Sequence, residues 1–219
     1  MLSTYVFDAY GTLFDVHAAI GRHRGAAGAD ADNLSQLWRT KQLEYTWTLT
    51  LAGHYFDFWT LTERALDYAL ERFPSVDRSL RATLLDAYRK LDAYSDARET
   101  LAGLKARGAR LAILSNGSPG MLASAIAAAG LETLFDAVLS VDAVQVYKPR
   151  SEVYALVTNN FGVKPREVGF VSSNRWDIMG ATNFGFRTFW INRSELPEEY
   201  ESFPPEQRLA GLADLLTQN

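Results

Sequence analysis

The sequence predicts an α/β fold, a doubly wound parallel sheet that carries an inserted helical cap. Two observations predict it. Short, apolar, β-prone runs alternate with helix-length segments through most of the chain, and one long helical stretch without strands interrupts them. The chain has 219 residues, of which 47% are hydrophobic, so it is long enough for one good-sized core and a small accessory module.

Five short runs of apolar residues predict the strands of the sheet. The first is Thr4-Tyr5-Val6-Phe7, which is too short for a helix and stops at Asp8. The others are residues 110–114, 137–139, 168–171 and 188–191. Helix-length segments separate them, among them 101–108, which ends on a glycine, and 119–130. Strands that alternate with helices in this way indicate a parallel sheet.

Residues 16–95 differ from the rest of the chain in their pattern of apolar residues. Apolar residues fall there in helix-length segments, and no run resembles the strands on either side. The sheet needs strands from both sides of this segment to close its core, so we expect a cap inserted into one domain rather than a separate domain. We therefore assign residues 1–15 and 96–219 to a Rossmann-like core and residues 16–95 to the helical cap.

The composition narrows the class of partner. Lys and Arg number 22 against 26 Asp and Glu, a formal charge of −4, and no block of like charges suggests a nucleic acid or a membrane surface as partner. The chain has no cysteine, which excludes disulfides, thiolate nucleophiles and zinc–thiolate sites. The first apolar run has no basic residue ahead of it and is cut by Asp8, unlike a signal peptide. We expect a soluble, cytoplasmic protein.

Polar side chains stand at or after the ends of four predicted strands. They are Asp8 after the first, Ser115 and Asn116 after the second, Lys148 beyond the third, and Ser172, Ser173, Asn174 and Asp177 after the fourth. Each one alone has an ordinary explanation as a helix cap, a turn residue or a solvated loop residue. In an open parallel sheet, however, ligands bind outside the carboxyl ends of the strands. Four polar strand ends therefore favour one common site.

Four motifs resemble the signatures of the haloacid dehalogenase superfamily. They are Asp8-Ala9-Tyr10-Gly11-Thr12-Leu13-Phe14-Asp15, Ser115-Asn116-Gly117, Lys148-Pro149 and Ser172-Ser173-Asn174-Arg175-Trp176-Asp177. The first and last motifs, together with cap residues 38–45, resemble more narrowly the L-2-haloacid dehalogenases. The resemblance implies hydrolysis of short (S)-2-haloalkanoic acids, including haloacetates, to 2-hydroxy acids with inversion. It also implies a homodimer whose small-molecule partners are the haloacid and the halide ion.

Tyr10 separates this chain from the phosphatases of the superfamily. Those enzymes resemble one another in carrying a second aspartate at this position, which protonates the leaving alcohol and helps to hold Mg²⁺. A halide leaves as a weak base and needs no proton. Asp8 and Asp177 could still pair around Mg²⁺, but the positive charge of Lys148 competes with a cation there. We therefore expect no metal and no other cofactor.

The resemblance also implies a two-step mechanism. Asp8, kept ionised by Lys148 and by donors such as Thr12, attacks the halogen-bearing carbon and forms an ester. Water then attacks the carbonyl carbon of Asp8, so the configuration at the substrate carbon inverts only once. The residues implied for orienting and activating this water are Asp177, Lys148, Ser172 and Asn174.

Further residues are implied around this centre. Ser115 and backbone amides near Tyr10 and Gly11 are expected to bind the substrate carboxylate. Tyr154 corresponds to a tyrosine that supports the lysine in the family, although ordinary helix packing would explain it equally well. These assignments place substrate recognition on the same strand ends as the chemistry.

Arg39 is the cap residue with the clearest implied role. With Asn116 it is expected to stabilise the departing halide, an electrostatic effect that grows in a dry cavity. On spacing alone, a surface pairing of Arg39 with Glu44 is the better explanation, and only the match of residues 38–45 favours the halide site. Thr40 departs from the glutamine of some relatives. The expected apolar wall around the substrate consists of Tyr10, Leu43, Phe58 and Trp176.

Two other functions remain open at this point. A Mg²⁺-dependent phosphatase of the same superfamily is possible, although Tyr10 argues against it. A non-enzymatic interaction module would have no need of Asp8, Arg39, Lys148 and Asp177 as a set. The preferred halogen does not follow from the sequence, and aromatic residues at 45–49 and 54–59 are candidates for a dimer contact or for packing within the cap.

Overall fold

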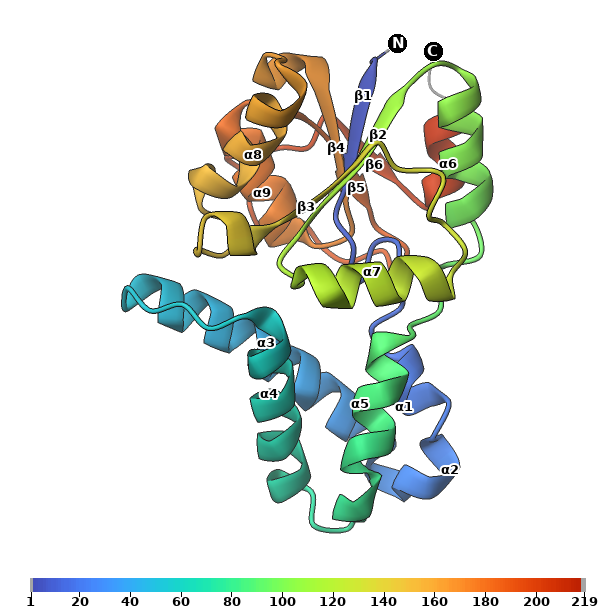
Figure 1. Cartoon of the computed structure of the whole chain (residues 1–219), viewed down its shortest axis with the longest axis vertical. Helices are drawn as coiled ribbons and strands as arrows, with labels where there is room; N and C mark the ends of the chain where they lie inside the picture. Colours follow the sequence, from blue (N-terminus) through green and yellow to red (C-terminus); the bar gives the residue numbers. More distant parts are fainter. Residues whose placement is uncertain (1, 218–219) are drawn as a thin grey trace.

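The computed structural model describes residues 2–217. Six parallel strands form one sheet in the order β3-β2-β1-β4-β5-β6. The strands are β1 (Thr4–Phe7), β2 (Arg110–Ser115), β3 (Ala137–Ser140), β4 (Val168–Ser172), β5 (Arg187–Ile191) and β6 (Gln207–Leu209). Helices cover both faces of the sheet (Figure 1). The predicted doubly wound parallel sheet is therefore confirmed.

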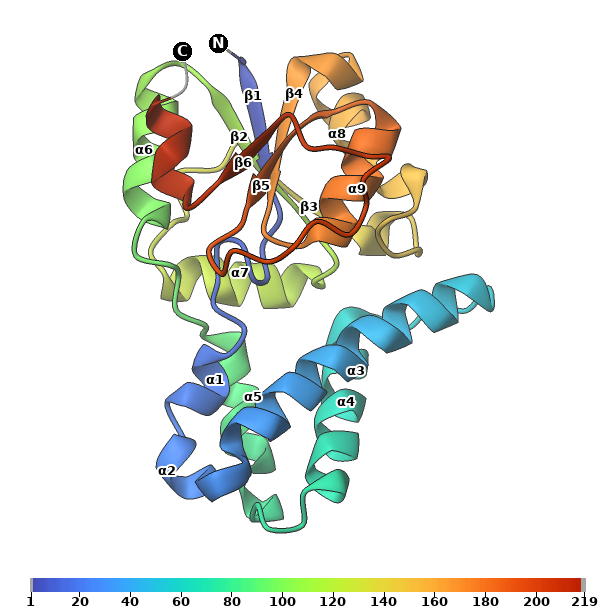
Figure 2. The ribbon, with the colours of Figure 1, turned by 180° about the vertical axis from the view of Figure 1, so that it is seen from behind.

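The two faces carry different helices, as Figures 1 and 2 show. Helices α8 (Ser151–Phe161) and α9 (Arg175–Phe184) cover one face. Helix α6 (Ala97–Ala106) and the 3₁₀ segment η5 (Leu212–Thr217) cover the other, and α7 (Pro119–Ala128) follows β2. Two further 3₁₀ turns, η3 (Val141–Ala143) and η4 (Pro165–Glu167), lie in the connections.

The central strand β1 decides where the site lies. All four of its residues are buried, and Thr4 is in register with Arg110 of β2 on one side and with Val168 of β4 on the other. The chain moves outward from β1 through β2 to β3 and then returns to β4, so the strand order reverses between β1 and β4. Ligands of doubly wound sheets bind at such a reversal. Asp8 and Ser172 therefore end neighbouring strands at the place where a ligand is expected.

The predicted strands agree with the observed ones to within one residue at each end. The sixth strand, β6, was not predicted. It is only three residues long, two of its residues are polar, and only Leu209 is buried, so it carries no apolar pattern that a strand prediction could use. Its place at the edge of the sheet, paired with β5, comes from tertiary contacts.

The segment between β1 and α6 is helical. It contains α1 (Ala18–Gly21), α2 (Arg24–Ala27), η1 (Gly28–Asp30), α3 (Ala31–Leu51), α4 (Phe58–Arg72), η2 (Arg78–Leu80) and α5 (Arg81–Arg89). These helices form a body below the carboxyl edge of the sheet (Figure 1). No helix within residues 2–217 is both long and apolar enough to cross a membrane.

The chain passes between the sheet and this helical body twice, near residues 13–15 and 92–94, and these two crossings lie side by side. The Asp15 N–H donates to the Asp92 carbonyl at 2.9 Å, and the Tyr94 N–H donates to the Leu13 carbonyl, also at 2.9 Å. This pairing places both ends of the helical body next to the loop that follows β1. We propose that residues 16–95 form a helical cap inserted into the core between these two crossings.

Candidate active site

Asp8 lies at the centre of the strand ends, and its two carboxylate oxygens have different surroundings. Oδ1 accepts a hydrogen bond from Lys148 Nζ at 3.1 Å. Oδ2 accepts from Asn174 Nδ2 at 2.8 Å and from Thr12 Oγ1 at 3.0 Å, with a longer contact from Ser172 Oγ at 3.5 Å. Asp8 is 4% exposed. Oδ2 is therefore held by three neutral donors, whereas Oδ1 has one charged neighbour.

Lys148 joins Asp8 to Asp177. Its ammonium donates to Asp8 Oδ1, to Asp177 Oδ2 at 2.7 Å and to the Leu114 carbonyl at 2.7 Å, which uses all three N–H groups. The side chain is fully buried. Burial alone would lower the pKa of Lys148, but the two carboxylates outweigh it and the pKa lies above its ordinary value. Lys148 is thus a fixed positive charge between two negative ones.

Asp177 lies on the first turn of α9 and is also fully buried. Its Oδ1 accepts a hydrogen bond from Tyr154 Oη at 2.7 Å, and its Oδ2 pairs with Lys148. Burial raises the pKa of Asp177, and the attraction of Lys148 opposes this only in part. A carboxylate whose pKa is raised in this way is a stronger base than a solvated one. Asp177 therefore has the surroundings of a general base.

Tyr154 contacts a different partner from the one we expected. The family resemblance implied that it supports Lys148, but its hydroxyl donates to the Asp177 carboxylate and reaches Lys148 only through that carboxylate. Burial raises the pKa of Tyr154 well above its ordinary value, so the hydroxyl stays protonated and remains a donor. Its contact orients Asp177.

A small, nearly closed cavity lies beside Asp8. Its lining consists of Asp8, Tyr10, Arg39, Leu43, Phe58, Ser115, Asn116, Asn174 and Trp176. Every one of these residues was singled out from the sequence. Polar groups come from the strand ends and the Arg39 guanidinium, and most of the apolar surface comes from the aromatic rings. The lining suits a small molecule with one anionic and one apolar end.

Arg39 points from α3 into this cavity. It is half-buried, and its Nη2 donates to the Tyr10 carbonyl at 3.3 Å. The alternative pairing of Arg39 with Glu44 is wrong, because the Glu44 carboxylate pairs with Lys41 at 2.8 Å. Arg39 therefore brings a positive charge from the cap to a cavity whose floor is formed by the sheet.

The strand end after β2 supplies two further groups. Asn116 Oδ1 accepts from the Lys148 N–H at 3.2 Å, so the side-chain NH₂ group is the part of Asn116 that can donate to a bound anion. Ser115 Oγ accepts from the Gly117 N–H at 3.0 Å, which leaves its hydroxyl proton as a donor. Both side chains line the cavity.

Backbone amides near Tyr10 and Gly11 were expected to bind the substrate carboxylate, but the N–H of Gly11 itself has a partner within its own loop. The Gly11 N–H donates to the Phe14 carbonyl at 2.8 Å, and Gly11 is absent from the cavity lining. Its φ of +92° turns the amide back into its own loop. A Cβ at this position would lie 3.7 Å from Asn174 Nδ2, an ordinary contact distance, so the positive φ rather than crowding accounts for the glycine.

Comparison with known proteins agrees with this geometry. The family model for haloacid dehalogenase-like hydrolases matches residues 2–185. (S)-2-haloacid dehalogenase 1 of Pseudomonas sp. strain CBS-3 is 51% identical over 211 residues, covering 96% of this chain and 93% of that protein. The chain belongs to the haloacid dehalogenase-like hydrolases.

Two solved structures are similar over the whole length of this hydrolase. A dehalogenase crystal structure has a TM-score of 0.97 and 47% sequence identity, covering 100% of this chain and 98% of the other. L-2-haloacid dehalogenase from Xanthobacter autotrophicus with chloropropionic acid covalently bound has a TM-score of 0.90 and 40% identity, covering 99% and 98%.

The acidic residues of this hydrolase do not fit the Mg²⁺ site of its phosphatase relatives. The Lys148 ammonium stands between Asp8 and Asp177 and contacts both, and a buried tyrosine, Tyr10, takes the place of the second aspartate. Within residues 2–217, no group of three or more His, Cys, Asp or Glu side chains is arranged to hold a metal ion.

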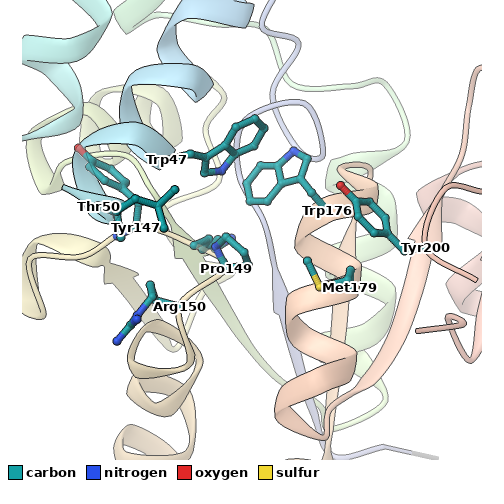
Figure 3. A pocket seen from close by; sticks show the side chains of 10 residues that line it. Trp47, Thr50, Tyr147, Pro149, Arg150, Trp176, Met179 and Tyr200 are labelled. Carbon is teal, nitrogen blue, oxygen red and sulfur yellow. Dashed lines mark hydrogen bonds between the residues drawn. The ribbon is translucent and has the colours of Figure 1, made fainter. Parts of the chain in front are cut away.

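An apolar groove lies outside the cavity of this hydrolase, and Trp176 lines both. The groove is lined by Trp47, Thr50, Leu51, Tyr147, Lys148, Pro149, Arg150, Trp176, Met179 and Tyr200. Figure 3 shows the Trp47 and Trp176 rings next to each other, and they meet edge to face, with centroids 5.5 Å apart and an interplanar angle of 79°. Trp176 is therefore the residue shared by the linings of the small cavity and the larger groove, whereas Trp47 lines the groove.

Arg193 is the residue near the site that sequence reasoning missed. It follows β5 by two residues and contacts the loops after β1 and β4. Asn192 and Arg193 directly follow Ile191, so the fifth predicted strand also ends in polar residues. That signal was present in the sequence.

Proposed function

We propose that this chain hydrolyses short (S)-2-haloalkanoic acids, including haloacetates, to 2-hydroxy acids with inversion through an ester on Asp8. The observation that carries the proposal is the pair of carboxylates bridged by Lys148 beside a small cavity into which Arg39 points. The similarity to (S)-2-haloacid dehalogenases, one of them with chloropropionic acid covalently bound, supports it. The proposal includes no metal, because the Lys148 ammonium stands between Asp8 and Asp177 and Tyr10 takes the place of a second aspartate.

In the first step, Asp8 displaces the halide. We assign the attack to Oδ1, because Oδ2 is occupied by Thr12, Asn174 and Ser172 while Oδ1 accepts only from Lys148. Oδ1 forms a bond to C2 as the carbon–halogen bond breaks, and the halogen leaves with both electrons. The Arg39 guanidinium and the Asn116 amide stabilise the charge that develops on the halide. The substrate carboxylate binds the Ser115 hydroxyl.

In the second step, water cleaves the ester. Asp177 takes a proton from water, whose oxygen adds to the carbonyl carbon of Asp8. The charge that develops falls on Oδ2, where the Thr12, Ser172 and Asn174 donors already stand, so these three groups form an oxyanion hole. The intermediate then expels the product oxygen, which takes up the proton held by Asp177. Asp8 returns to a carboxylate as its remaining proton passes to solvent.

The stereochemistry follows because the two steps act on different carbon atoms. Only the first step breaks and forms bonds at C2, and in-line displacement inverts that carbon. The second step cleaves the acyl–oxygen bond of the ester and leaves C2 untouched. An (S)-2-haloacid is therefore expected to give the (R)-2-hydroxy acid.

Halide release tests the proposal directly. The purified chain is incubated with (S)-2-chloropropionate, chloroacetate or fluoroacetate in the presence of a chelator, and free halide is measured. Release that depends on Asp8 supports the proposal and ranks the halogens. If no halide is released but a phosphate ester is hydrolysed once Mg²⁺ is added, the chain is a phosphatase and the proposal is wrong.

We also propose that the chain is a cytoplasmic homodimer. Cap side chains offer apolar surface, with Leu51 89% exposed at the end of α3 and Phe56 and Tyr68 also exposed. Sedimentation equilibrium is expected to give twice the mass of the 24.4 kDa chain. A monomer at micromolar concentration would refute this assignment without affecting the proposed chemistry.

A further inference from the structure

Arg193 contacts both loops that hold Asp8. Its Nη1 donates to Ser173 Oγ at 2.9 Å, in the loop after β4, and its Nη2 donates to the Thr12 carbonyl at 3.1 Å, in the loop after β1. A guanidinium presents its N–H groups in a fixed planar fork, so two acceptors on separate loops are held at a set distance from each other. Arg193 itself lies outside the cavity lining.

Each loop that Arg193 contacts carries donors to Asp8 Oδ2. Thr12 Oγ1 donates to Oδ2, and the Ser173 N–H donates in turn to Thr12 Oγ1 at 2.8 Å, which turns the hydroxyl proton toward Asp8. The residues on either side of Ser173 supply the other donors, Ser172 Oγ and Asn174 Nδ2. Arg193 therefore contacts Thr12, which supplies one donor, and Ser173, whose two chain neighbours supply the other donors of the proposed oxyanion hole.

The guanidinium is fixed from its other side. It lies over the Tyr94 ring, 3.8 Å from the centroid, and its Nη2 is 3.7 Å from Asp96 Oδ1. The Tyr94 N–H donates to the Leu13 carbonyl, so the ring belongs to the second crossing between cap and core. Cation–π contact and the Asp96 charge leave Arg193 little freedom to move away from the two loops.

We propose that Arg193 is a positioning residue for ester hydrolysis, holding the loops after β1 and β4 so that the Oδ2 donors of Asp8 stay in place. This inference rests on the proposed function. Donors of an oxyanion hole act only when they are already placed where charge develops. Oδ1 is held from the other side by Lys148, so attack on the substrate depends less on Arg193 than hydrolysis of the ester does.

Arg193→Met tests the proposal, with Arg208→Met as its matched control. Arg208 lies in the same C-terminal part of the chain, stacks over an aromatic ring at 5.0 Å and donates to the Leu196 carbonyl at 3.1 Å, but contacts neither loop. For both variants, halide released in the first turnover, steady-state kcat and KM, and the fraction of protein carrying the ester by intact-protein mass are measured. The ester fraction separates a hydrolysis defect from a loss of fold.

Arg193→Met is expected to release halide in the first turnover nearly as fast as the wild type. Its steady-state kcat is expected to fall about 10- to 100-fold with the ester accumulating, since misplaced oxyanion donors slow mainly the second step. KM is expected to fall with kcat and kcat/KM to stay near that of the wild type, because kcat/KM reports only the steps up to halide release. Arg208→Met is expected to behave as the wild type. Ser173→Ala is expected to lower kcat less, and its effect is expected not to add to that of Arg193→Met, because the two side chains form one contact.

Three outcomes would overturn the role of Arg193. They are an unchanged kcat in folded Arg193→Met, an equal loss in Arg208→Met, and an equal slowing of first turnover and steady state. Should Arg193→Met fail to fold, Arg193→Lys keeps the charge over Tyr94 but loses the fork, and wild-type turnover in that variant would overturn the role as well. Absence of halide release from the wild type would instead refute the proposed function.

Discussion

Replacing Asp177 with asparagine separates the two proposed steps. The asparagine has nearly the same shape and can still accept from Lys148, but it cannot take a proton from water. In the native site, two carboxylates face one ammonium, at 2.7 Å and 3.1 Å. The variant therefore keeps the Lys148–Asp8 ion pair and loses only the charge used in the second step.

The structure sets the size of both effects. Breaking a buried ion pair usually costs about 3–5 kcal/mol because one charge is left without a partner. Here Lys148 keeps Asp8, so we expect a smaller loss of about 1–3 kcal/mol, the range for a disturbed buried hydrogen bond at Tyr154. Loss of a general base lowers turnover by about 10²- to 10⁴-fold. Activity should thus fall far more than stability does.

The assay counts halide per active site. Asp177→Asn is expected to release one halide for each chain in a fast first phase and then to stop or continue slowly. Intact-protein mass is expected to rise by the mass of the substrate without its halogen, and peptide mapping should place the addition on Asp8. Tyr154→Phe serves as a control, because it removes one hydrogen bond to Asp177 and leaves the carboxylate.

Two results would refute this reasoning. Steady-state turnover close to that of the wild type would show that Asp177 is not the base. A complete absence of the first halide, in a variant whose thermal unfolding is near that of the wild type, would show that Asp177 is needed for attack on C2. In that case the assignment of Asp177 to the second step alone would be wrong.

The remaining predictions concern the nucleophile, the pH dependence and the pocket. Asp8→Asn is expected to lower halide release by about 10⁴-fold or more while the circular dichroism spectrum stays unchanged, and retained activity would exclude Asp8 as nucleophile. Burial, with the charge of Asp8, raises the pKa of Asp177 to about 6 in the free site, and the ester removes that charge. Because only the deprotonated form accepts a proton, kcat is expected to fall with dropping pH at a value below about 6. A kcat that stays level across this range would contradict the assignment. Trp176→Ala is expected to join the cavity to the outer groove and to raise kcat/KM for 2-bromohexanoate relative to (S)-2-chloropropionate by about 10-fold, and an unchanged ratio would show that Trp176 does not limit chain length.

Much of the site was predictable because a parallel sheet brings distant positions together by rule. Asp8, Asn116 and Asp177 are far apart in the chain, yet each follows a strand whose carboxyl end lies at the same edge. Short apolar runs were enough to find those strands, and polar residues at their ends then marked the site. The cap residue Arg39 had no such rule behind it, and only the resemblance of residues 38–45 pointed to it.

The individual contacts were less predictable. Tyr154 was expected to support Lys148 and instead donates to Asp177, whose other carboxylate oxygen pairs with Lys148. The Gly11 amide was expected to face the substrate and instead closes its own turn. Moving a side chain by about 3 Å, the length of one hydrogen bond, is enough to change its hydrogen-bond partner. A sequence pattern does not specify side-chain positions that closely.

The sequence by itself determined the class of fold, the edge of the sheet that bears the site and the chemical groups available there. These follow from apolar periodicity and from side-chain identity, which are properties of the chain before it folds. Only the tertiary structure decided which oxygen of Asp8 each donor holds, that Arg39 points into the cavity while Glu44 pairs with Lys41, and that Arg193 links two loops more than 150 positions apart. These depend on how the cap and the strand-end loops pack against one another in three dimensions.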